Sequence, residues 1–113
     1  MINEIRELET DAHPDLVSSI LKLFLDSMPA RVERIKSAID SGRSDLLQKE
    51  AHSFKSSAGN IGANELSVIC ATLEGLGKSE RLEGAAELFA QLRAEILEVQ
   101  MELHRLPELN KLD

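Results

Sequence analysis

The stretch Ala51-His52-Ser53-Phe54-Lys55-Ser56-Ser57-Ala58-Gly59-Asn60-Ile61-Gly62-Ala63 separates into two faces when it is placed on an α-helix, at about 100° per residue. One face is apolar and predicts a core stripe, which consists of Leu47, Ala51, Phe54, Ala58 and Ile61. The opposite face carries His52 among Asp45, Gln48, Lys49, Lys55, Ser56 and Gly59. Because His52 lies opposite the core stripe and small residues follow it, we expect an exposed ring that a large partner can approach.

The rest of the chain repeats this helical spacing, with apolar residues three and four positions apart. We predict main helices over 15–41, 45–60, 63–76 and 80–105, and a short helix over 2–9. Glycine punctuates the connections, and Gly75, Gly77 and Ser79 predict a turn after the third main helix. No segment has the pattern of a strand. The sequence therefore predicts one all-α domain over 1–113, an antiparallel up-down four-helix bundle with a short extra N-terminal helix.

Composition narrows the class of protein further. The 113 residues are 42% hydrophobic and 29% charged, which is typical of a soluble globular domain. The net charge of −7 argues against nucleic acid as a partner, since its phosphates would be repelled. A single cysteine excludes an internal disulfide and any cysteine-rich metal site. No apolar run is long enough to span a bilayer and no signal peptide is seen, so we expect a cytoplasmic protein that is not membrane-bound.

The pattern His52-x-Phe54-Lys55-Ser56-Ser57-Ala58-x-x-Ile61-Gly62-Ala63 resembles the signature of histidine phosphotransfer (HPt) domains, the four-helix carriers of two-component phosphorelays. The resemblance extends over nearly the whole chain, with further matches at Phe24, Ala38, Leu66, Cys70, Leu73-Glu74 and Gly77. Most members carry glycine where this chain has Ser56, which is still a small residue.

The resemblance implies that His52 is the phosphoryl acceptor and that Lys55 stabilises charge on the phosphoryl group. It also implies that Ser56 and Gly59 are small so that a receiver domain can approach, and we expect Gln48 and Lys49 to border the partner as well. For Gly59 an alternative reading is that it only begins the end of its helix. An exposed imidazole is partly neutral at pH 7, so a nucleophilic form is available.

We therefore predict a monomeric phosphoryl carrier that exchanges a phosphoryl group between His52 and a receiver-domain aspartate, or accepts it from a hybrid histidine kinase. Two alternatives remain: a domain of this fold that binds receivers without transfer, and a helical adaptor unrelated to phosphorelays. We expect no autokinase activity, because Gly75-Leu76-Gly77-Lys78-Ser79 lacks the earlier glycine and the strand of a nucleotide-binding loop. No cofactor or metal site is expected, and any Mg²⁺ would belong to the receiver.

Three other features are given structural roles. His13 and His104 lie far apart in the sequence without metal-ligand spacing, so we expect both to be solvated. Cys70 is predicted to be a small core residue. The carboxylates of the last predicted helix are expected to be solvated on its outer side; they are Glu83, Glu87, Glu95, Glu98 and Glu102.

Overall fold

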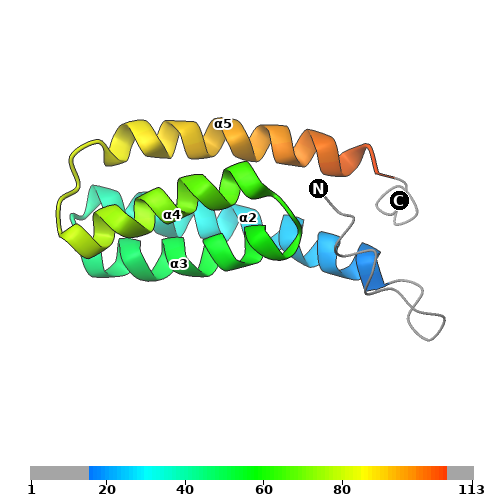
Figure 1. The fold of residues 1–113 in the computed structure, drawn as a ribbon, viewed down its shortest axis with the longest axis horizontal. Helices are drawn as coiled ribbons and strands as arrows, with labels where there is room; N and C mark the ends of the chain where they lie inside the picture. The colour runs from blue at the N-terminus through cyan, green and yellow to red at the C-terminus, as the bar shows by residue number, and fades with distance from the viewer. Residues whose placement is uncertain (1–15, 107–113) are drawn as a thin grey trace.

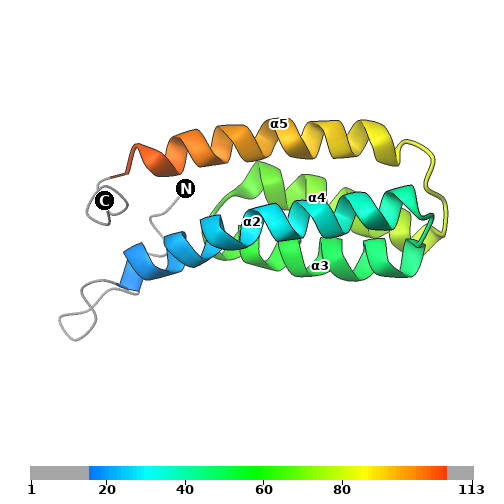
Figure 2. The same cartoon turned by 180° about the vertical axis from the view of Figure 1, so that it is seen from behind.

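A computed structural model describes residues 16–106 of the chain, and these residues form four α-helices. They are α2 (Leu16–Asp40), α3 (Ser44–Asn60), α4 (Asn64–Ser79) and α5 (Ala85–His104). The helices run alternately up and down and lie side by side, with α5 lying along α4 and α2 (Figures 1 and 2). The prediction of an all-helical antiparallel bundle is confirmed, and the helix predicted at 2–9 lies outside the described residues.

The core is apolar and is built from one stripe on each helix. All five core positions predicted for this stretch are buried: Leu47, Ala51, Phe54 and Ala58 in α3, and Ile61 directly after its end. The stripe of α2 contributes Val17, Leu21, Phe24, Met28, Ile35 and Ala38, and α5 contributes Ala85, Leu92, Ile96, Val99 and Leu103. Burial also raises the pKa of the Cys70 thiol to about 12, in keeping with its predicted role as a core residue. Burial of these stripes is the main stabilising contribution to the bundle.

Two short glycine turns join α2 to α3 and α3 to α4 in the same way. Gly42 and Gly62 have φ angles of 69° and 76°, a left-handed conformation that glycine adopts at little cost. The amide that follows each glycine donates back across the helix end, from Arg43 to Ala38 and from Ala63 to Ala58, both at 2.9 Å. These tight turns make α2, α3 and α4 successive antiparallel neighbours.

The connection between α4 and α5 differs from the predicted one. We expected a turn at Gly75, Gly77 and Ser79 and a helix from residue 80, but α4 continues to Ser79 and α5 begins at Ala85. Glu80 ends α4 with a φ of 60°, and Gly84, with a φ of 83°, precedes α5. Leu82 is half-buried against the core from this connection and not from a helix.

Candidate functional site

His52 stands on the outward face of α3, directly opposite the buried stripe. Its side chain is 61% exposed, as expected from its position on the helix. The ring is nevertheless held, because Nδ1 lies 2.7 Å from Oε2 of Glu74 in the neighbouring helix α4. The imidazole is thus exposed to solvent and fixed in orientation at the same time.

Glu74 is the buried member of this arrangement, with a side chain only 8% exposed. Its second oxygen, Oε1, accepts a hydrogen bond from Nζ of Lys55 at 2.5 Å. The hydrogen bond from Lys55 holds the pKa of the Glu74 carboxyl below its usual value; burial works against this, and the bond to His52 adds to it. Glu74 is therefore a carboxylate whose two oxygens are each committed to one cation or ring nitrogen.

The bond to Glu74 makes the two ring nitrogens of His52 chemically different. An ionised carboxylate only accepts hydrogen bonds, so Nδ1 must carry the proton in the Nδ1–Oε2 contact. In the neutral imidazole the lone pair then lies on Nε2. The arrangement leaves Nε2 as the nucleophilic atom.

Gly77 brings α4 close enough to α3 for this contact to form. A Cβ built on Gly77 would lie 2.6 Å from the backbone nitrogen of Gln48 and 2.8 Å from its Cα. Gly77 is buried in α4, one turn beyond Glu74, and Gln48 is one turn before His52 in α3. The residue expected in a turn is therefore a helical contact that sets the distance between the two helices at the site.

A shallow depression of about 390 Å³ opens beside His52, and residues of α3 and α4 line it: Asp45, Gln48, Lys49, His52, Glu74 and Lys78. The structure thus brings the predicted Gln48 and Lys49 together with His52. Lys55 lies on the other side of the ring along α3, one turn further on, where its ammonium contacts Glu74. Its predicted role on the phosphoryl group stays a prediction.

Two residues of this site were not assigned to it from the sequence alone. Glu74 entered only as part of the family pattern, and Lys78 only as part of a rejected nucleotide-binding motif. The signal that could have found them is the four-residue spacing of Glu74 and Lys78, which places both on one face once α4 is continued through Gly77. Because a turn was predicted at Gly75 and Gly77, Lys78 was not placed on the same helix as Glu74.

Ser56 and Gly59 continue the face of His52 towards the end of α3, and both are exposed. Gly59 is helical, and a Cβ added there would meet only Oγ of Ser67, at 3.8 Å, an ordinary van der Waals contact. The helix ends after Asn60, so Gly59 belongs to its last turn. Its position is compatible with the predicted clearance, which stays a prediction.

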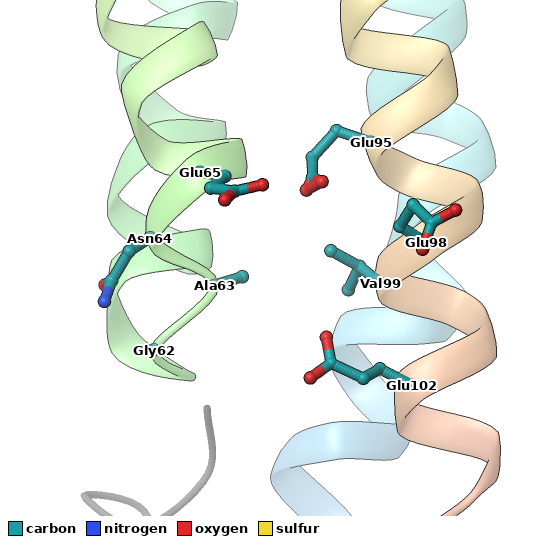
Figure 3. Close-up of a pocket in the computed structure, with 8 residues that line it drawn as sticks. All are labelled: Gly62, Ala63, Asn64, Glu65, Glu95, Glu98, Val99 and Glu102. Atoms are coloured by element: carbon teal, nitrogen blue, oxygen red, sulfur yellow. The ribbon is translucent and has the colours of Figure 1, made fainter.

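A larger hollow, of about 500 Å³, lies between the start of α4 and α5 and is acidic (Figure 3). Glu65 and Glu95 extend towards one another across it, and Glu98 and Glu102 flank it from α5. Burial, followed by the proximity of Glu65, raises the pKa of the Glu95 carboxyl. The expectation that Glu95 is solvated on the outer side of its helix is wrong, since it is half-buried beside α4. Four carboxylates would repel a phosphoryl group, which excludes this hollow as its site.

Within residues 16–106, no group of three or more His, Cys, Asp or Glu side chains is placed to hold a metal ion. None of the helices formed by these residues has an apolar stretch that would cross a bilayer. His104 is exposed at the end of α5, whereas His13 lies outside the described residues.

The fold and the site together define a helical bundle that presents one oriented, exposed histidine. The model of the Hpt domain family matches residues 19–102 of this chain. The chain belongs to the histidine phosphotransfer domain family.

Two sequence relatives and one solved structure support this assignment. The chain is 30% identical over 94 residues to histidine-containing phosphotransfer protein 4 of Arabidopsis thaliana, covering 81% of this chain and 74% of the relative. It is 26% identical to histidine-containing phosphotransfer protein 2 of the same plant over 111 residues, 96% of this chain and 71% of the relative. The crystal structure of histidine-containing phosphotransfer protein B from Pseudomonas aeruginosa PAO1 superposes with a TM-score of 0.78 and 27% identity, covering 80% and 79% of the two chains. The chain therefore has a phosphotransfer role in a phosphorelay.

Proposed function

We propose that His52 is the residue that carries the phosphoryl group, and that it exchanges this group with the aspartate of a receiver domain. The observation that supports this most is the exposed His52 ring held at Nδ1 by the buried Glu74 carboxylate, 2.7 Å away. Phosphoryl transfer requires mainly that the acceptor be positioned and that charge be stabilised. An exposed ring that has already been oriented meets the first requirement.

In the forward step, the lone pair on Nε2 of His52 attacks the phosphorus of an aspartyl phosphate. An N–P bond forms, the P–O bond to the aspartate breaks, and the aspartate leaves as a carboxylate. No proton has to move, because Nδ1 keeps its hydrogen and the positive charge that develops on the ring is balanced by Glu74. The reverse step returns the group to a receiver by the same path, so Glu74 serves both directions as a positioning residue.

The partner is expected to cover the face of α3 around the ring. We assign Gln48, Lys49, Ser56 and Gly59 to this contact, and Lys55 to charge stabilisation beside the transferring group. The partner is a receiver domain, alone or within a hybrid histidine kinase, and it supplies any Mg²⁺ at its own aspartate. The protein itself acts as a cytoplasmic monomer that needs no cofactor and does not phosphorylate itself from ATP.

The test is incubation with a phosphorylated receiver domain, followed by detection of phosphate on the chain that is lost in acid and stable in base. We expect the parent to be labelled and His52→Gln to remain unlabelled. His104→Gln is the matched control, since it changes another exposed histidine at the end of α5. Labelling of His52→Gln would show that another residue is the acceptor. Receiver binding without labelling of the parent would favour a receiver-binding domain, and neither binding nor labelling would favour an unrelated adaptor.

A further inference from the structure

The depression beside His52 has an uneven charge balance. Its two carboxylates are both engaged by cations: Asp45 binds Arg43 through two hydrogen bonds of 3.1 Å, and Glu74 binds Lys55. The hydrogen bond from Arg43 also holds the pKa of the Asp45 carboxyl below its usual value, so the carboxyl is ionised and paired. The unpaired charge of the depression therefore comes from the lysines that line it.

These cations are Lys49 of α3 and Lys78 of α4, both exposed on the lining of the depression. Neither forms an ion pair with a carboxylate of residues 16–106, whereas Lys22 and Lys36 on α2 are paired with Asp26 and Asp40. The chain as a whole has a net charge of −7, so these two ammonium groups beside the oriented histidine form a local region of positive charge in an acidic protein. The depression is suited to an anion.

We propose that Lys49 and Lys78 form an oxyanion subsite that holds the phosphoryl group once it is on His52, an inference that rests on the proposed function. A phosphoryl group brings close to two negative charges and three acceptor oxygens. Each ammonium has three N–H donors on a long flexible stem, so it can reach these oxygens without a fixed geometry. The lysines donate hydrogen bonds to the non-bridging oxygens and keep their protons, so no bond is made or broken by them.

The subsite adds two lysines to Lys55, the cation already proposed to lie beside the transferring group. Lys55 is bonded to Glu74 and balances the carboxylate that orients the ring. Lys49 and Lys78 lie in the depression, whose other lining residues carry paired charges or, as with Gln48, none. Because Lys78 is supplied by α4 and Lys49 by α3, the subsite depends on the same close packing of the two helices that places Glu74 on His52.

The first measurement needs no receiver. The chain is phosphorylated chemically with phosphoramidate, the ³¹P signal of phosphorylated His52 is identified by its loss in His52→Gln, and its pH titration is followed. Ammonium groups near the phosphoryl group lower the pH of its titration midpoint, so we expect Lys78→Gln and Lys49→Gln each to raise that midpoint by roughly half a pH unit. Lys78→Arg keeps the charge and should restore the parent value. The matched control is Lys36→Gln, a lysine of α2 paired with Asp40, and it should leave the midpoint unchanged.

The second measurement is the rate of transfer from a phosphorylated receiver, which we expect to fall about 3- to 10-fold in Lys78→Gln relative to Lys36→Gln. If either Lys78→Gln or Lys49→Gln leaves the titration midpoint at the parent value, that lysine does not hold the phosphoryl group and the two-lysine subsite is refuted. The subsite is refuted in that case even if transfer slows, since the lysines would then contact only the receiver. A parent that is phosphorylated by phosphoramidate but by no receiver would refute the proposed function, while the midpoints would still decide the subsite.

Discussion

Gly77 of α4 lies so close to the backbone of Gln48 in α3 that a Cβ on the glycine would stand 2.6 Å from the Gln48 nitrogen. The contact is to backbone, which cannot turn aside as a flexible side chain can. It lies one turn along both helices from the pair of His52 and Glu74. The separation of the helices at Gly77 therefore determines whether the Glu74 carboxylate reaches the imidazole.

Replacing Gly77 by alanine should test this dependence. We expect Gly77→Ala to force α4 away from α3 and to lower the free energy of unfolding by about 1–3 kcal/mol, as overpacking in a core does. Transfer to His52 should slow as well, because Glu74 is drawn back from Nδ1. Thermal melts and transfer rates measure the two effects.

Gly75→Ala is the matched control for Gly77→Ala. Gly75 is also a helical glycine of α4, but beyond its own turn of helix nothing lies within 4 Å of a Cβ placed there. We expect it to raise the free energy of unfolding by several tenths of a kcal/mol to about 1 kcal/mol, through helix propensity alone. Equal behaviour of the two variants would disprove the close contact at Gly77.

A second prediction concerns the proton on the His52 ring. In the parent, ¹⁵N NMR should show the neutral ring protonated at Nδ1, because the Glu74 carboxylate accepts from that atom at 2.7 Å. Glu74→Gln should keep this tautomer, since the amide oxygen also accepts, whereas Glu74→Ala should let both tautomers appear and slow transfer about 10-fold or more. An unchanged tautomer and rate in Glu74→Ala would remove Glu74 from the mechanism.

The Glu74 carboxylate should make the free energy of unfolding depend on pH. Because its pKa is lowered in the folded protein, chiefly by the bond from Lys55, Glu74 stabilises the fold above its unfolded pKa. That contribution is lost as the pH falls through the lowered pKa. The free energy of unfolding of Glu74→Ala should therefore lie furthest below that of the parent near neutral pH, by roughly 1–3 kcal/mol for a buried hydrogen-bonded group. In acid the two free energies should converge. Urea melts at several pH values will show whether the two curves meet.

Gly59 separates partner clearance from helix stability. Position 59 is helical and a Cβ there meets only Ser67 at 3.8 Å, so Gly59→Ala should stabilise α3 by a few tenths to about 1 kcal/mol and largely preserve transfer. Gly59→Gln should fold well but transfer poorly, since its long side chain would project beside His52 where the receiver approaches. A well-folded Gly59→Gln with the parent transfer rate and receiver affinity would end the clearance argument.

The acidic hollow between α4 and α5 should destabilise the bundle at neutral pH. The pKa of Glu95 is raised by burial and then by Glu65, Glu98 and Glu102, so the folded protein holds its proton more tightly than the unfolded chain. Stability is therefore lost as the pH rises through the raised pKa. Glu95→Gln should raise the free energy of unfolding by several tenths of a kcal/mol at pH 7. The gain should vanish below the unfolded pKa of the residue, where parent and variant are both uncharged. Glu83→Gln, an exposed change before α5, is the control in the same melts.

The helical fold and the exposure of His52 could be predicted because both follow from periodicity within single helices. Phe54 and Ala58 are buried and His52 is exposed for the same reason, namely their angular positions around α3. No knowledge of the other helices is needed to place them. The family pattern then gave His52 a role that its exposure alone could not.

The other half of the site could not be predicted because it depends on packing between helices. Gly77 resembles a turn residue in sequence, and only the backbone of Gln48 shows that the glycine serves close approach. With the helix ended too early, Glu74 and Lys78 lost their common face. Glu95 was misjudged for a related reason, since a carboxylate on the side of α5 becomes half-buried only once α4 lies beside it.

The pairing of His52 with Glu74 within one helical hairpin limits which changes in chain length the protein can accept. Inserting or deleting a single residue in α3 or α4 between these two positions would rotate one partner about 100° around its helix and shift it by about 1.5 Å. The carboxylate would then point away from the ring. The connection from Glu80 to Gly84 lies beyond both partners and contributes nothing to their contact. Length variation compatible with phosphotransfer should therefore occur between α4 and α5, and not within the hairpin.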